Sequence, residues 1–183
     1  MARPPHAKER VLDAFEALLL TEGERGATLD AVARTAGVSK GGLLYHFGSK
    51  DELASALIAR LSQLVAQDVE QMRAAPEGTV EFYLRTSVME NDPLDRAIIA
   101  VSRLAQGGST GAAEALHLMR EQWAETIRPE VRDQASLDLV MLLSDGLYFN
   151  NALDVNNAGQ NPGALPTGAD LDALVALVRR ATL

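Results

Sequence analysis

Cysteine is absent from the 183 residues, which excludes disulfide bonds and thiolate metal sites. Aromatic residues make up only 4% of the chain, and no run of alternating Val, Ile and Thr occurs, so the composition favours helices over strands. No stretch of about 18 uncharged apolar residues is present, and the start "MARPPHAKER" lacks the apolar core of a signal peptide. We therefore expect a helical, cytoplasmic protein that does not enter a membrane.

Positive charge is also scarce, since the net charge is −8, but the charge is unevenly distributed. Residues 1–50 hold seven Lys and Arg against six Asp and Glu, so the remainder of the chain carries the whole acidic excess. This asymmetry predicts a small N-terminal part that can approach a polyanion and an acidic body that a polyanion would repel.

The first 50 residues have the spacing of a helix-turn-helix. Thr28 is a good N-cap for a short second helix, Gly37 stands where a left-handed residue ends it, and Ser39 can cap a third helix. Ser49 and Glu52 form an S-x-x-E capping box that opens a long helix to about residue 72. The preceding first helix carries apolar residues on one face: Val11, Leu12, Phe15, Leu18 and Leu19.

The stretch "GVSKGGLLYHFGSKDEL", residues 37–53, has the residue types that a DNA-reading helix needs. Small residues near the start of such a helix let its backbone approach phosphates, while lysine, tyrosine and histidine donate hydrogen bonds to phosphates or base edges. Leu43 and Phe47 are expected to hold the helix on its neighbours. The predicted DNA-binding residues are Thr28, Ser39, Lys40, Gly41, Gly42, Tyr45, His46 and Lys50.

"TLDAVARTAGVSKGGLLYHFGSKDEL", with the preceding "ERVLDAFEALLLTEG", resembles the DNA-binding domain of TetR-family transcriptional regulators over roughly residues 7–60. One departure is Leu44, where many members carry a tyrosine, and it leaves open whether a phosphate contact is weakened. The resemblance implies an all-α fold: a three-helix helix-turn-helix domain over residues 1–50, followed by a helical ligand-binding and dimerisation domain over residues 51–183.

The last two predicted helices are strongly apolar. "SLDLVMLLSDGLYFNNAL" is apolar over most of its circumference and should be buried on several sides, and "DLDALVALVRRA" follows a Thr167 cap. The resemblance implies that such a pair forms the interface of a homodimer, and the alternative is that both helices close the core of a monomer. Between them, residues 156–168 are interpreted as a connector.

The resemblance also implies an effector pocket in the C-terminal domain. Candidate lining residues are the larger or polar side chains on otherwise apolar helices, each of which could instead be core or surface: Tyr83, Met89, Arg103, His117, Trp123, Tyr148, Phe149 and Asn151. The three histidines offer no ligand-spaced partner, so no metal is expected, and no cofactor is predicted.

The predicted function is a ligand-responsive repressor that binds a near-palindromic operator in double-stranded DNA as a homodimer and is released by a small, largely apolar effector. An alternative is a helix-turn-helix regulator controlled by a protein partner. A helical enzyme is disfavoured, since the sequence has no nucleophile elbow, zinc-protease or dinucleotide-binding motif.

Overall fold

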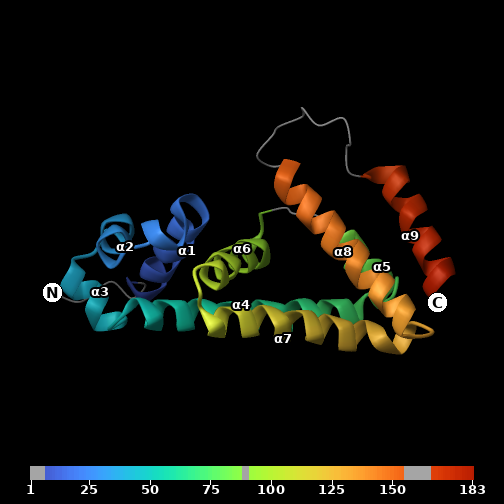
Figure 1. Cartoon of the computed structure of the whole chain (residues 1–183), viewed down its shortest axis with the longest axis horizontal. Coiled ribbons are helices and arrows are strands. Elements are labelled where there is room, and N and C mark those ends of the chain that lie inside the picture. Colours follow the sequence, from blue (N-terminus) through green and yellow to red (C-terminus); the bar gives the residue numbers. More distant parts are fainter. Residues whose placement is uncertain (1–6, 88–90, 155–165) are drawn as a thin grey trace. The chain divides into compact units, whose positions relative to one another are not determined.

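The computed structural model of the chain describes residues 7–87, 91–154 and 166–183, with the helical backbone alone for residues 151–154. These residues form α-helices and one short 3-10 helix, Arg128–Glu130, with no strand among them, which confirms the predicted all-α class (Figure 1). The α-helices are α1 (Ala7–Gly26), α2 (Leu29–Ala36), α3 (Lys40–His46), α4 (Lys50–Ala74), α5 (Thr79–Arg85), α6 (Pro93–Gln106), α7 (Thr110–Ile127), α8 (Gln134–Asp154) and α9 (Gly168–Thr182).

The chain divides into two compact units. The first comprises Met1–Val65 and Asn91–Met119, and the second comprises Ala66–Glu90 and Arg120–Leu183. The boundaries at residues 65/66 and 119/120 fall inside helices, so α4 and α7 each contribute residues to both units. The functional division predicted at residue 50 stays a prediction.

In the first unit, α6 lies against α1, and α1 also contacts α2 and α3. Phe15, Leu19 and Leu43 are fully buried there, together with Leu57 of α4. α6, which begins at Pro93, therefore adds to the core that supports α2 and α3. The predicted three-helix domain did not include this helix.

Several predicted helix starts are confirmed, and two differ in detail. Asp92 and Asp95 form a complete capping box at the start of α6, and Pro93 occupies its first turn. The Ser49 hydroxyl accepts from the Glu52 amide at 3.2 Å, but the Glu52 carboxylate accepts from the Gly48 amide rather than closing the box on Ser49. The Thr167 side chain makes no capping hydrogen bond to α9.

The second unit is built around an apolar core from α4, α5, α7, α8 and α9. Its buried members are Met72, Val80, Tyr83, Leu84, Ile127, Leu137, Val140, Met141, Val175 and Val178. The Glu130 carboxylate accepts hydrogen bonds from the first amides of α5, at Thr79 (2.9 Å) and Val80 (3.3 Å). This side chain therefore satisfies helix-terminal donors that have no partner inside the helix.

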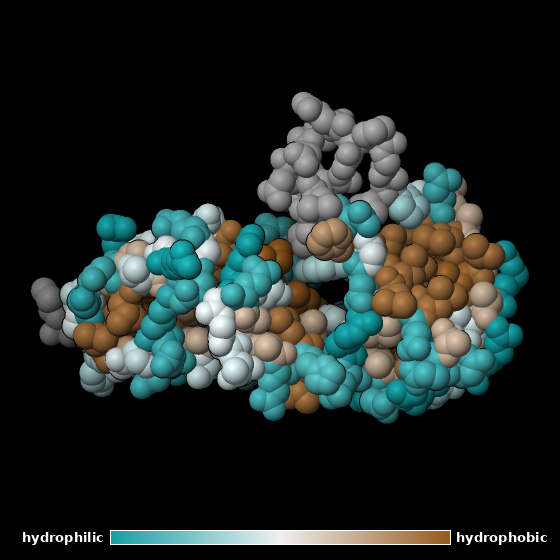
Figure 2. All heavy atoms as spheres, viewed as in Figure 1, coloured by the Kyte–Doolittle hydropathy of each residue, from teal (hydrophilic) through white to brown (hydrophobic). Residues whose placement is uncertain are grey.

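The prediction that α8 is buried on several sides is wrong for the single chain. Leu139, Leu142 and Phe149 are 46%, 64% and 64% exposed. Figure 2 shows apolar residues gathered at the surface over α8 and α9. Leu177 of α9 is 55% exposed. The other described residues therefore leave part of the apolar circumference of α8 exposed.

No helix in the described ranges is long and apolar enough to span a bilayer. Of the predicted connector at residues 156–168, residues 156–165 lie outside the described residues. Residues 166 and 167 precede α9, and Gly168 is its first residue.

Candidate nucleic-acid interface

The turn between α2 and α3 has the geometry that the sequence predicted. The Thr28 hydroxyl accepts from the Ala31 amide at 3.2 Å, and α2 ends at Gly37, which adopts the left-handed conformation with φ 65° and ψ 37°. The Ser39 hydroxyl then accepts from the Gly42 amide at 3.1 Å and opens α3. Two side-chain caps and one glycine therefore set the angle at which α3 leaves α2.

α3 has a buried face and an exposed face. Leu43 and Phe47 are 0% and 3% exposed, which confirms their predicted packing role. Lys40, Gly41 and Tyr45 are exposed, Tyr45 at 73%. Thr28 and Ser39 are exposed as well, so their hydroxyl hydrogens can donate to a ligand while their oxygens cap the helices.

Both predicted lysines are held by carboxylates of the same chain. Lys40 Nζ lies 3.0 Å from an oxygen of Asp30, and the two side chains are 56% and 70% exposed. Lys50 Nζ lies 2.6 Å from both the backbone oxygen and a carboxylate oxygen of Glu24, with side chains about one third exposed. The Lys40 pair can exchange for a phosphate at little cost, whereas Lys50 also ties the end of α1 to the start of α4.

Tyr45 and His46 lie edge to face, with ring centroids 5.3 Å apart. His46 is partly buried, and its Nε2 atom is buried with no hydrogen-bond partner among the described residues. A phosphate contact by His46 would therefore have to use Nδ1 or a rearranged ring, whereas the Tyr45 side chain is largely exposed.

The predicted ligand-binding residues are only partly brought together. Tyr83 is buried in the second unit, its ring centroid is 5.5 Å from that of Trp123, and Tyr148 of the same unit is partly buried. Arg103 and His117 are exposed residues of the first unit, and Phe149 is exposed on α8. Met89 and the side chain of Asn151 lie outside the described residues.

The surroundings of Tyr83 combine apolar packing with buried hydrogen bonds. Trp123 Nε1 donates to an Asp68 carboxylate oxygen at 2.8 Å, and the hydroxyls of Ser87 and Ser144 are 2.7 Å apart. Burial raises the pKa of Tyr83 to about 12, although a hydrogen bond with Ser144 opposes the shift. Tyr83 is therefore a neutral phenol at neutral pH.

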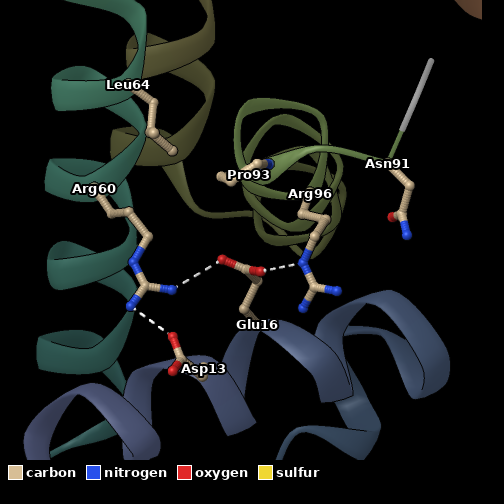
Figure 3. Close-up of a pocket in the computed structure, with 7 residues that line it drawn as sticks. All are labelled: Asp13, Glu16, Arg60, Leu64, Asn91, Pro93 and Arg96. Carbon is tan, nitrogen blue, oxygen red and sulfur yellow. Dashed lines mark hydrogen bonds and ion pairs between the residues drawn. The ribbon is translucent and has the colours of Figure 1, made fainter. Parts of the chain in front are cut away.

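A cleft of about 460 Å³ lies in the first unit and is lined by Asp13, Glu16, Arg60, Leu64, Asn91, Pro93 and Arg96 (Figure 3). The Glu16 carboxylate pairs with both arginines that line the cleft. One of its oxygens is 3.1 Å from Arg60 Nη1, and the other is 2.8 Å from Arg96 Nε. Asp13 accepts from Arg60 at 2.8 Å. Burial lowers the pKa of Arg60, but its ion pairs with Asp13 and Glu16 outweigh burial and raise it above the ordinary value.

The charges that line this cleft are matched to one another, so they bind α1 to α4 and α6. Sequence reasoning missed Glu16, although a signal was present: the residue lies one turn from Leu12 and Leu19, at the edge of the apolar face of the first helix. A charged residue at such a position either leaves the core or needs a buried partner.

α2, the turn at Gly37 and α3 form a helix-turn-helix, and Lys40 and Tyr45 lie on the exposed face of α3. Residues 11–57 match the family model described as bacterial regulatory proteins, tetR family. The transcriptional regulator SrpR of Pseudomonas putida is 36% identical over 58 residues, 32% of this chain and 27% of SrpR, so the chain spans about a quarter of that relative's length.

The similarity extends beyond the first helices in other relatives. The transcriptional regulator LmrA of Bacillus subtilis is 26% identical over 134 residues, covering 69% of this chain and 71% of LmrA. The fold of the multidrug binding protein EbrR, solved in complex with imidazole, matches with a TM-score of 0.64 at 16% identity, over 99% of this chain and 97% of EbrR.

The matched segment and these relatives support the resemblance to TetR-family transcriptional regulators that the motifs of residues 7–60 predicted. The matching relatives SrpR and LmrA are described as transcriptional regulators, which agrees with the prediction that the chain is not an enzyme.

Proposed function

We propose that the chain is a repressor that binds a near-palindromic operator as a homodimer through residues 28–50, and releases it when a small, largely apolar ligand binds to the second unit. The observation that carries the proposal is the exposed face of α3, where Lys40, Gly41 and Tyr45 project from a helix that Leu43 fixes to the core. A helix with this polarity can lie in the major groove while its other face stays packed.

The homodimer is supported by the exposed stripe of α8. Leu139, Leu142, Gly146 and Phe149 follow one another at spacings of three or four residues, so they share one face of the helix. A Cβ added at Gly146 would meet no atom within 4 Å, so a second helix can approach closely there. An isologous pairing of this face would cover the stripe and supply two reading heads for two half-sites.

The effector site is supported by the contact between Tyr83 and Trp123 in the second unit, which also contains Tyr148. Tyr83 and Trp123 belong to or pack against the apolar core of that unit, and the structurally similar EbrR is described as a multidrug binding protein. For release, the ligand has to bind the form that cannot engage DNA more tightly than the form that can.

The first test is selection of duplexes from a random-sequence pool, followed by fluorescence anisotropy across a salt series. Wild type should bind a selected, near-palindromic duplex at two chains per site and reject a scrambled one. Lys50→Ala should weaken binding to all sequences, whereas Lys40→Ala should also relax base preference by about 1–3 kcal/mol at one position. Equal binding of every duplex by wild type would contradict the proposal.

Light scattering and the same anisotropy assay test the dimer. Leu142→Glu should give monomers by light scattering and lose tight operator binding, because a charge would be buried at the α8 face. Leu118→Glu is the matched control, since Leu118 of α7 is 48% exposed and lies outside the stripe. A wild-type monomer that still selects a palindrome would contradict the dimer, and a wild-type monomer without sequence selection would favour a protein partner on the α8 face.

A further inference from the structure

α3 exposes one large aliphatic side chain on the face proposed to read DNA. Leu44 is 40% exposed, although the adjacent Leu43 is fully buried. A single exposed leucine is ordinary on a protein surface, so its position has to carry the argument. Leu44 follows Lys40 by four residues and therefore lies one turn along the same face.

The exposed part of Leu44 takes no part in holding α3 in place. Leu43 and Phe47, at 0% and 3% exposed, fix the helix to its neighbours. Gly41 leaves open space beside this face, since a Cβ added there would meet no atom within 4 Å. A flat surface such as the floor of the major groove can therefore approach the Leu44 side chain.

Leucine has no donor or acceptor, so it can bind neither a phosphate oxygen nor the hydrogen-bonding edge of a base. The apolar group that the major groove offers is the C5 methyl of thymine. We propose that Leu44 contacts a thymine methyl in each half-site and is a specificity-determining residue of this protein. The inference rests on the proposed function, because it requires α3 to enter the major groove.

The spacing on the helix also limits where the thymine lies. Four residues advance about 6 Å along an α-helix, and successive base pairs are about 3.4 Å apart. The thymine read by Leu44 therefore lies within about two base pairs of the base or phosphate contacted by Lys40. Lys40 supplies charge at that position, and Leu44 supplies a contact that depends on the base.

The test removes one methyl group at a time. In a duplex selected by the wild-type protein, each thymine is replaced in turn, in both half-sites, by deoxyuridine, which keeps the base pairing and lacks the methyl. Dissociation constants are measured by anisotropy at one fixed salt concentration. At one symmetric position, we expect binding by wild type to weaken about fourfold per half-site, which corresponds to about 0.8 kcal/mol for one buried methyl.

Leu44→Ala should lose this sensitivity: it should bind the thymine and deoxyuridine duplexes equally, and bind the thymine duplex more weakly than wild type does. Leu118→Ala is the matched control, because it removes a comparably exposed leucine (48%) from α7 and should keep the full deoxyuridine effect. Circular dichroism verifies that both variants keep their helices.

Two results would overturn the inference while leaving the proposed function intact. One is selective operator binding by wild type that no deoxyuridine weakens. The other is a deoxyuridine effect that persists unchanged in Leu44→Ala, since another residue would then contact the methyl. If the wild-type protein selects no duplex at all, the proposed function itself fails, and this inference fails with it.

Discussion

Replacement of Glu16 by alanine should destabilise the first unit more than any loss of a surface ion pair. The Glu16 side chain is 6% exposed, and its two oxygens accept from Arg60 of α4 and Arg96 of α6 (Figure 3). Removal of one partner from a buried ion pair costs about 3–5 kcal/mol, because the other charge stays buried.

The structure places the expected cost at or below the lower end of that range. Arg60 keeps Asp13 at 2.8 Å and Glu9 at 3.2 Å, so it is not left without a carboxylate. Arg96 loses its 2.8 Å contact, but its side chain is 35% exposed and is partly solvated. We expect Glu16→Ala to lower the free energy of unfolding by about 2–3 kcal/mol, and Glu16→Gln, which keeps the shape and one acceptor, by less.

The assay is urea unfolding followed by circular dichroism, at a fixed chain concentration because association adds to apparent stability. The expected loss moves the urea midpoint by about 1 M. Glu125→Ala is the matched control: its pair with Arg128 is 68% and 48% exposed, so its loss should cost about 0.5 kcal/mol or less. A midpoint shift for Glu16→Ala no larger than that of Glu125→Ala would refute the reasoning.

Two further predictions concern backbone conformation and pH. Gly37→Ala should lower the free energy of unfolding by about 1 kcal/mol, since Gly37 has φ 65°, whereas Gly41→Ala in α3 should raise it by up to about 1 kcal/mol. A Cβ added at either site meets no atom within 4 Å, so the two variants differ only in backbone conformation. Equal urea midpoints for the two variants would therefore contradict the conformational argument. The pKa of Tyr83 is raised to about 12, above the usual value near 10. The stability that the neutral phenol contributes is therefore complete below pH 10 and is lost as the pH rises from 10 to about 12. The free energy of unfolding should fall there by up to about 1.4 kcal/mol per pH unit. Tyr83→Phe should remove that part of the pH dependence in unfolding measurements between pH 9 and 12, and parallel curves for the two proteins would count against a buried neutral phenol.

The helix-turn-helix was predictable because local chemistry sets it. Thr28 and Ser39 cap helices through atoms three residues away, and Gly37 adopts a conformation that depends on its own lack of a side chain. Such signals need no knowledge of distant parts of the chain. The packing of Leu43 and Phe47 followed from helical spacing alone.

The contacts that join distant segments were not predictable in this way. Glu16 meets Arg96, which is 80 residues further along the chain, and periodicity does not reveal which carboxylate pairs with which guanidinium. The pairing of Lys50 with Glu24 was not predicted from the sequence for the same reason. For α8, the apolar pattern correctly predicted a helix, but a pattern cannot state whether the covering surface comes from the same chain or from another.

The pairing of Lys40 with Asp30 has a consequence for how DNA binding responds to ions. A phosphate contact by a free lysine releases a condensed cation from the duplex and the lysine's own anion to solution, so affinity falls as salt rises. In this protein the anion beside Lys40 is a tethered carboxylate at 3.0 Å. When a phosphate takes its place, Asp30 stays attached to the protein next to the DNA, where it repels the phosphate or attracts a cation of its own. The number of phosphates inferred from a plot of affinity against salt should therefore fall short of the number that the lysines contact.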